Sequence, residues 1–208
     1  KSRGNVINPD DVVNLHGADT FRLYEMFMGP FDQMISWSDN NIIGIRRFVE
    51  RIWKMQFKIN TTDENKKLET LLHKTIKKVG EDIESMSFNT AVSSLMILAN
   101  EMERVAEIPQ RYFETFLALL SPFAPHITEE IWHRLGHKTL LATEKWPKFD
   151  ETKIKEEKTI IVVQINGKIR AQFEAENGIS ENEAKEKALA MPEVKKWLIG
   201  EVKKVIFV

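Results

Sequence analysis

The stretch LLSPFAPHITEEIW, residues 119–132, marks the place where two predicted helices meet. The first of these helices begins at Pro109 and continues to Leu120, and the second runs from Pro125 to Leu135. Proline is favoured in the first turn of a helix, because an N–H at that position would have no intrahelical partner. Two helices separated by so short a break pack most simply as antiparallel neighbours in a bundle.

The same helical spacing extends from this stretch back to Pro9. Apolar residues recur at steps of three and four, which places them on one side of each helix. Asn8 is expected to cap the first helix, and Ser38 is expected to cap a longer one. The predicted helices begin at Pro9, at Ala18 or Asp19 (ending at Met28), after Ser38 (ending near Phe57), after Thr62 and near Phe88, with a loop over Phe31–Trp37.

After Gly136 the pattern changes to that of a small second domain. Two β-rich runs are joined by Asn166-Gly167, the strongest short signal for a β-hairpin. Ser180 and Glu183 form a capping box for a helix, and a shorter helix starts at Met191-Pro192. The fold class is therefore mainly α, an antiparallel helical bundle followed by a small α+β domain with a hairpin, two helices and a strand. The predicted domains are 1–37, 38–136 (the bundle), 137–158 (a connector) and 159–208 (the α+β domain, whose last strand is KKVIFV, residues 203–208).

Composition restricts the kind of protein. With 208 residues, 42% hydrophobic and 29% charged, the chain can bury a core and lacks the composition of a disordered protein. It has no cysteine, which excludes disulfides and thiolate metal sites. No apolar run approaches the length of a membrane span and no signal-like segment is present, so the expected compartment is the cytoplasm. The net charge is −1, so any RNA-binding site must be local.

Residues that could support catalysis are sparse. The sequence shows no recognisable paired carboxylates, nucleophile–base set or glycine-rich phosphate loop. His126, Glu129 or Glu130, and His133 would share one helix face, as metal ligands do. The favoured interpretation is that these residues solvate the helix, because two histidines four residues apart, the usual signature, are absent. No metal site is predicted.

Two groups of basic residues are candidates for nucleic-acid contact. Such a group can follow a phosphate backbone, although it is more often just a solvated face. Trp37 lies in a predicted loop, where it could pack under a neighbouring domain or stack on a base. The first group is a helical stripe of Arg47, Arg51, Lys54 and Lys58; the second is Lys168 and Arg170 with Lys195, Lys196, Lys203 and Lys204.

The first residues, Lys1–Asn5, read as a basic loop that leads into a helix, an arrangement suited to holding an anion. Residues 1–38, from KSRGNV to MISWS, closely resemble the segment of bacterial-type leucyl-tRNA synthetases that begins at the KMSKS loop. LLSPFAPHITEEIW is similar to the signature of the helical anticodon-binding domain shared by the leucyl, isoleucyl, valyl and methionyl enzymes. VQINGKIRAQ (163–172) and ISENEAKEKALAMPEVKKWL (179–198) are similar to the small C-terminal domain of the leucyl enzymes.

This resemblance implies a class I synthetase that ligates leucine to tRNA(Leu) with ATP and Mg²⁺. Lys1 matches the second lysine of the KMSKS loop, which makes Lys1 the expected catalytic residue and Lys1 and Ser2 the expected ATP-binding loop. The bundle would support the tRNA without reading the anticodon, and the C-terminal domain would touch the tRNA elbow. The expected tRNA contacts are Arg47, Arg51, Lys54, Lys58, Lys168, Arg170, Lys195 and Lys196.

The resemblance also implies that parts of the enzyme lie outside this chain. The leucine site and most of the ATP site would belong to a catalytic domain preceding residue 1, and the C-terminal domain would lack a last strand. The chain alone is therefore expected to be inactive, to carry no cofactor and to be monomeric. The alternatives are the corresponding region of an isoleucyl, valyl or methionyl enzyme, and a protein-interaction module.

Overall fold

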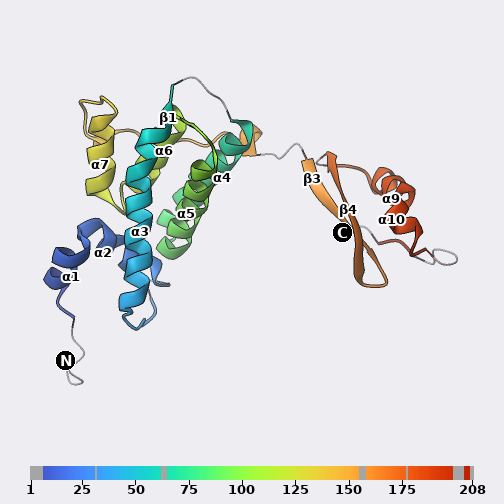
Figure 1. Cartoon of the computed structure of the whole chain (residues 1–208), viewed down its shortest axis with the longest axis horizontal. Coiled ribbons are helices and arrows are strands. Elements are labelled where there is room, and N and C mark those ends of the chain that lie inside the picture. Colours follow the sequence, from blue (N-terminus) through green and yellow to red (C-terminus); the bar gives the residue numbers. More distant parts are fainter. Residues whose placement is uncertain are drawn as a thin grey trace. The chain divides into compact units, whose positions relative to one another are not determined.

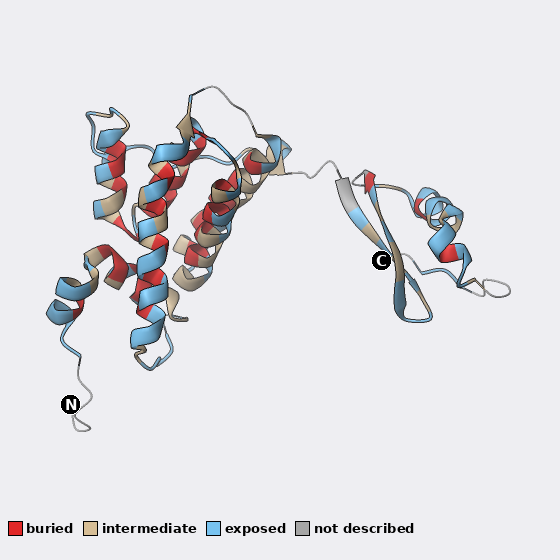
Figure 2. Ribbon diagram, in the orientation of Figure 1, coloured by how far each residue is buried: buried red, intermediate tan, exposed pale blue. Residues whose placement is uncertain are grey.

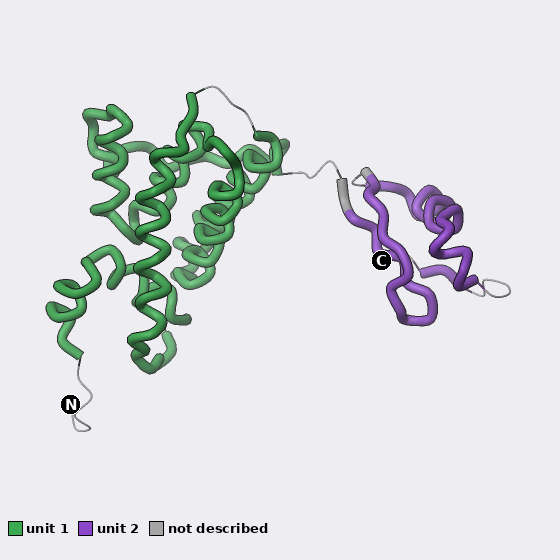
Figure 3. Tube along the Cα trace, in the orientation of Figure 1, with its two compact units in different colours: residues 1–154 green, residues 155–208 purple. Residues whose placement is uncertain are grey.

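The computed structural model describes residues 7–30, 32–61, 65–154, 158–176, 178–198 and 204–206. The chain forms two compact units, residues 1–154 (unit 1) and residues 155–208 (unit 2), which Figure 3 shows in different colours. Each unit has its own secondary structure and its own buried residues.

Unit 1 is a bundle of helices whose order is shown in Figure 1. Helices α4 and α5 lie side by side, and α2 packs on both α3 and α5. The predicted helices are confirmed to within a few residues. They are α1 (Pro9–His16), α2 (Ala18–Phe27), α3 (Asp39–Met55), α4 (Lys66–Glu84), α5 (Phe88–Arg104), α6 (Gln110–Leu120) and α7 (Pro125–Arg134). The structure adds elements that were not predicted: the short helix α8 (Glu151–Ile154) and the 3-10 turns η1 (Gln56–Lys58) and η2 (Leu141–Thr143).

One continuous apolar cluster fills the inside of this bundle. Figure 2 shows the buried positions on the sides of the helices that face one another. Burying each large aliphatic or aromatic side chain contributes roughly 1.5–3 kcal/mol, which is why the spacing of these residues fixes the helix faces. Helices α5 and α6 each contribute six buried residues to this cluster: Ala91, Val92, Leu95, Leu98, Ala99 and Met102 from α5, and Tyr112, Phe113, Phe116, Leu117, Leu119 and Leu120 from α6.

A short parallel pairing joins the end of α3 to the beginning of α6. Strand β1 (Ile59–Asn60) pairs with β2 (Ile108–Pro109), with Ile59 opposite Ile108. Pro109 thus ends a strand and occupies the N-cap of α6, which begins at Gln110. The sequence did not predict this pairing, since two residues are too few to show a strand pattern.

Helix α2 holds the turn between α6 and α7. The side chain of Asp19 is almost fully buried, and its carboxylate accepts hydrogen bonds from the backbone N–H groups of His126 (3.3 Å) and Ile127 (2.7 Å). His126 Nδ1 lies 2.7 Å from the same carboxylate. Arg22 donates to the carbonyl of Pro122 at 2.8 Å. Asp19 therefore acts as the N-cap group of α7 from a distant part of the chain, because His126 and Ile127 lie in the first turn of α7, where N–H groups have no partner within the helix.

Ser38 occupies the N-cap position of α3, as predicted, but its hydroxyl makes no capping hydrogen bond. Its backbone N–H donates to the Tyr24 hydroxyl (2.8 Å), and that hydroxyl donates to the Ser38 carbonyl (3.2 Å). Trp37 packs edge-on against Tyr24 with ring centroids 4.7 Å apart, and its indole N–H donates to Asp39. Trp37 is therefore a packing residue inside unit 1.

The segment predicted as a connector, 137–158, is divided. From residue 137 to Ile154 it belongs to unit 1, and from Leu141 to Lys153 it follows the surface of the bundle. Its backbone N–H groups at Leu141 and Ala142 donate to Glu129, at 3.0 and 2.9 Å. The sequence did not predict this packing, because each of these hydrogen bonds joins residues that are 12 or 13 positions apart.

The second half of this segment runs along α4. The Trp146 indole lies against Gly80, and the Phe149 ring lies under the ammonium of Lys77 at 5.3 Å. The next contacts are a hydrogen bond from the Asp150 N–H to His73 Nδ1 (3.0 Å) and one from the Lys153 ammonium to Glu69 (2.7 Å). The partners on α4 are thus spaced three or four residues apart, which places them on one face of the helix.

Unit 2 contains the predicted hairpin and both predicted helices. Strands β3 (Lys158–Ile165) and β4 (Lys168–Glu176) are antiparallel, and α9 (Glu181–Ala190) and α10 (Pro192–Lys195) pack on β4. Asn166 and Gly167 both have positive φ, 51° and 75°, as a type I′ turn requires. The capping box at Ser180 is present, and the buried residues of the unit include Ala175, Ala184 and Val194.

The prediction of a final strand over residues 203–208 is wrong where it can be compared. Residues 204–206 are described and form no strand, and the other residues of this segment lie outside the described part of the chain. Val205 and Ile206 are exposed, Ile206 to 71%. Alternating apolar residues give a strand only when a neighbouring strand pairs with them and one face is buried, and neither condition can be seen in sequence.

The contact between His73 and Asp150 makes the stability of unit 1 depend on pH. Burial lowers the pKa of His73, and the nearby Lys153 and Arg111 lower it further, against the opposing effect of Glu69 and Asp150. A histidine whose pKa is lower in the folded state stabilises the fold above its unfolded pKa, near 6.5, and loses this contribution as pH falls. We expect the thermal midpoint of the wild type to fall between pH 7.5 and pH 5.5 more steeply than that of His73→Asn, whose amide oxygen can accept the same hydrogen bond.

The control for this pH series is His16→Asn, which removes a histidine outside the contact and should keep the wild-type slope. Thermal unfolding followed by circular dichroism at several pH values measures the difference. An identical slope in wild type and His73→Asn would contradict the assignment.

Candidate nucleic-acid interface

The basic stripe predicted on α3 divides into two pairs. Arg47 and Lys54 are exposed, two helical turns apart, which is about 10 Å along the axis. Arg51 and Lys58 instead contact α5. The stripe therefore offers two cations to a ligand, while the other two already have partners in the protein.

Arg51 makes a two-pronged contact with Glu103 of α5. Its Nε lies 2.9 Å from both carboxylate oxygens, and its Nη2 also reaches Glu103 and Asn100. The hydrogen bonds to Glu103 raise the pKa of Arg51 above its usual value. Such planar pairs are stronger than single contacts, although both side chains remain about one third exposed.

Lys58 lies at the C-terminal end of α5. Its ammonium donates to the carbonyls of Glu103 (2.8 Å) and Val105 (3.2 Å). Carbonyls at a helix C-terminus have no partner within the helix and carry the negative end of its dipole, so a cation there is stabilising. Arg51 and Lys58 together hold α3 against the end of α5.

Aromatic and other basic residues lie on α3 and just beside it. Phe57, three residues after Lys54, is 75% exposed. On the adjoining helix α7, the guanidinium of Arg134 lies 4.6 Å from the centre of the Trp53 ring and also pairs with Glu130. Arg46 is engaged by Glu50 and by the carbonyl of Leu15. Arg47 and Lys54 are thus the cations of the predicted stripe that remain open to an anionic ligand.

In unit 2 the structure brings together two pairs of predicted residues that lie far apart in sequence. Lys168 and Arg170 are on β4, and Lys195 and Lys196 are at the end of α10. The guanidinium of Arg170 stacks on Trp197 at 3.4 Å from the ring centre. Sequence reasoning missed Trp197, although its position directly after two lysines is a signal for a basic surface with an aromatic residue in it.

Three of the residues expected to be functional lie outside the described part of the chain. They are Lys1 and Ser2, the expected catalytic and ATP-binding residues, and Lys203. Lys204, the last lysine of the second group, is described and exposed. The roles of Lys1 and Ser2 therefore stay predictions from the resemblance.

The residues of α7 that have the spacing of metal ligands make other contacts. His126 is bound by Asp19, and Glu129 accepts the N–H groups of Leu141 and Ala142. Glu130 pairs with Arg134, and His133 Nδ1 lies 3.1 Å from the carbonyl of His137. Among the described residues, no three histidine or acidic side chains are grouped to hold a metal ion.

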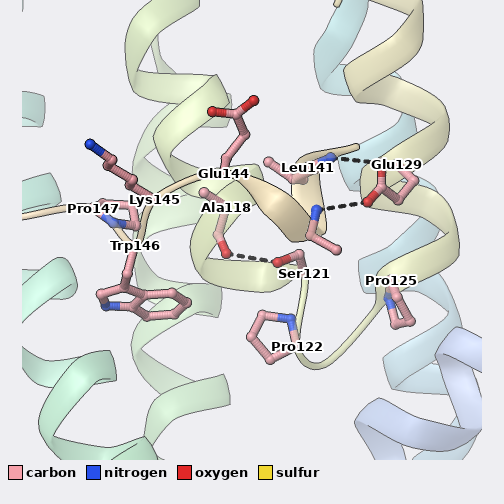
Figure 4. A pocket seen from close by; sticks show the side chains of 11 residues that line it. Ala118, Ser121, Pro122, Pro125, Glu129, Leu141, Glu144, Lys145, Trp146 and Pro147 are labelled. Atoms are coloured by element: carbon pink, nitrogen blue, oxygen red, sulfur yellow. Dashed lines mark hydrogen bonds between the residues drawn. The ribbon is translucent and has the colours of Figure 1, made fainter. Parts of the chain in front are cut away.

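A shallow hollow of about 260 Å³ lies between the turn after α6 and the segment around Trp146 (Figure 4). Pro122 and Trp146 form much of its apolar lining, as Figure 4 shows. Three of its polar side chains are engaged: Ser121 donates to the Ala118 carbonyl, Glu129 accepts two backbone N–H groups, and Glu144 accepts from Thr139. Because the serine and both glutamates of the lining are already hydrogen-bonded, this hollow is a feature of packing.

Residues 65–188, more than half of the chain, match the family described as the anticodon-binding domain of tRNA ligase. The chain therefore belongs to this family of helical domains from tRNA ligases. In the part of the chain that the structure describes, no helix combines the length and apolar character that crossing a membrane requires.

Among solved structures, the chain is similar to LeuRS, a leucyl-tRNA synthetase, from Agrobacterium radiobacter K84 (agnB2) in its ternary complex with tRNA and LeuAMS. The two chains are 29% identical with a TM-score of 0.78. The match covers 95% of this chain and 28% of the synthetase chain. The resemblance to leucyl-tRNA synthetases predicted from the sequence is thereby confirmed.

The division of the α3 stripe can be tested by stability measurements. We expect Arg51→Gln to lower the free energy of unfolding of unit 1 by about 1 kcal/mol, because it removes the contact with Glu103 and leaves that carboxylate without its main partner. Arg47→Gln, the matched control on the same helix, should stay within about 0.5 kcal/mol of wild type. Urea unfolding followed by circular dichroism compares the two variants, and equal losses would contradict the division.

Proposed function

We propose that this chain is the tRNA-binding part of a leucyl-tRNA synthetase, the enzyme that joins leucine to tRNA(Leu). The observation that carries the proposal is the match to a tRNA-bound LeuRS over 95% of this chain at 29% identity. Membership of the tRNA-ligase family supports the class of enzyme. Since the chain spans 28% of that LeuRS, the activity, substrates and partners of a whole synthetase are all part of the proposal.

The choice of leucine within this class rests on two observations. The anticodon-binding signature is shared by enzymes for several apolar amino acids, so it supports only the class. The resemblance of residues 163–172 and 179–198 to the C-terminal domain of the leucyl enzymes, and the similarity to LeuRS over nearly the whole chain, favour leucine.

The bundle would bind tRNA by placed charges. Arg47 and Lys54 are exposed, and each can meet a backbone phosphate. A double-stranded RNA region is recognised largely through its shape, 2′-hydroxyls and phosphates, which suits a surface with a few well-positioned cations and a net charge of −1. Arg51 and Lys58 would act indirectly, by fixing α3 in position.

ATP with Mg²⁺ and leucine would be substrates of the whole synthetase. Within this chain the resemblance assigns only Lys1 and Ser2 to ATP, and both lie outside the described residues. The structure therefore supports no step of the activation reaction. A cytoplasmic location and a monomeric state belong to the same proposal.

The tRNA-binding role predicts a particular salt dependence. The 208-residue chain should retain tRNA(Leu) in a filter-binding assay, with an affinity that falls steeply as salt increases. Arg47→Gln and Lys54→Gln should each lower the affinity and reduce the slope of log K against log salt by about 1, since each removes one phosphate contact.

Lys138→Gln is the matched control, because Lys138 is exposed and lies outside the stripe. It should keep the affinity and the slope of the wild type. If the wild type fails to retain tRNA at low salt but forms a stable complex with a protein, the chain is a protein-interaction module and the proposal is wrong.

The expected role of Lys1 can be tested in a complete synthetase that carries this sequence. Lys1→Ala should reduce leucine-dependent ATP–pyrophosphate exchange by on the order of 10²–10³-fold, because it removes a positive group from the departing pyrophosphate. Lys138→Ala should leave the exchange rate unchanged. A Lys1→Ala enzyme as fast as wild type would exclude a catalytic role for Lys1.

A further inference from the structure

Arg170 occupies an irregular position in the hairpin of unit 2. Gln164 pairs with Ile169 and Val163 pairs with Ala171, so Arg170 is the extra residue of a β-bulge. A bulge of this kind turns the side chain of the extra residue away from the direction that the regular alternation would give it. The hairpin therefore sets the direction of this guanidinium.

The side chain of Arg170 lies on the ring of Trp197, just beyond the end of α10. The guanidinium carbon is 3.4 Å from the ring centre, which is close enough to cover one face of the indole. Trp197 is nevertheless 49% exposed. The exposed area must therefore come from the opposite face and the edges of the ring.

Packing alone does not account for a charged group in this place. The Nε atom of Arg170 is buried and has no hydrogen-bond partner among the described residues. An unpaired buried donor is unfavourable, whereas a leucine or methionine could cover the same indole face without this cost. The charge and planarity of the guanidinium are thus features that a purely structural role would not need.

The surroundings of the pair are basic. Lys195 and Lys196 directly precede Trp197 and are exposed, and Lys168 is exposed two residues before Arg170. Glu193 is the acidic residue of α10. A half-exposed aromatic ring backed by a cation and flanked by lysines has the composition of a surface on which a nucleic-acid base stacks while its phosphates meet the lysines.

We infer that Trp197, backed by Arg170, is a stacking platform for an unpaired or terminal base of the RNA, with Lys168, Lys195 and Lys196 contacting adjacent phosphates. This inference rests on the proposed function, since it assumes that the chain binds tRNA. A base inside a duplex has both faces covered by its neighbours, so the platform selects a base that is open on at least one face. Stacking of this kind tolerates any base, because every base has a π-face.

The test compares stacking with charge. Binding of the 208-residue chain to tRNA(Leu) is measured over a series of salt concentrations. Trp197→Leu should weaken binding by about 5- to 150-fold with an unchanged salt slope, because it removes a stacking surface and no charge. Lys196→Gln, which removes a phosphate contact, should weaken binding and also reduce the slope by about 1. Trp197→Phe, which keeps an aromatic ring, should recover most of the lost affinity.

Two controls separate the platform from a loss of folding. Trp146→Leu makes the same change at a half-exposed tryptophan of unit 1 and should leave the affinity unchanged. A fully paired RNA duplex with capped ends should bind wild type and Trp197→Leu equally, because it offers no open base. A variant whose unit 2 had unfolded would lose the lysine contacts as well, and its salt slope would fall.

The possible results distinguish this inference from the proposed function. If wild type binds tRNA and Trp197→Leu binds equally well, or loses affinity for the capped duplex to the same extent, the platform is wrong and the proposed function stands. If wild type shows no binding to tRNA at any salt concentration, the proposed function itself is wrong.

Discussion

The arrangement of unit 1 depends on one buried carboxylate, that of Asp19, which joins α2 to the beginning of α7. The Asp19 carboxylate of α2 accepts hydrogen bonds from the first N–H groups of α7, and Arg22, one turn along the same helix, donates to the carbonyl of Pro122. The turn between α6 and α7 is thus held at both its donors and its acceptors by one short helix. A buried carboxylate is tolerated only when its oxygens are fully hydrogen-bonded, so α2 and α7 each require the other to be in place.

Local signals in the sequence predicted the helix boundaries, the Asn166-Gly167 turn and the capping box at Ser180, because each depends on residues within a few positions of one another. The same reasoning could not predict the partners of Asp19, the docking of residues 141–153 on α7 and α4, or the pairing of β1 with β2. These contacts join residues that are 12 to more than 100 positions apart. The strand expected near Ile206 failed for a related reason, since a strand is defined by its neighbour.

In the candidate interface, the four basic residues of the α3 stripe also show what the sequence can and cannot predict. A helical stripe of cations is visible in sequence, but which cations remain open depends on the next helix. Arg51 binds Glu103 and Lys58 binds the C-terminal end of α5, while Arg47 and Lys54 face solvent. In unit 2 the reverse occurs, since folding joins Arg170 to Trp197 and makes one surface from two separate segments. Net charge predicted neither outcome, because it does not show where individual charges are held.

The row of contacts along α4 has a consequence for how the bundle opens. Near Leu141 the segment is anchored by a buried side chain and by backbone hydrogen bonds to Glu129, whereas from Asp150 to Lys153 it is held by partly buried polar pairs. Local opening takes place where buried apolar contact is least. The segment should therefore detach from the bundle first at its C-terminal end. Amide protons near Lys153 should then exchange with solvent well before those at Leu141, and the segment should be partly detached before the helices beneath it open.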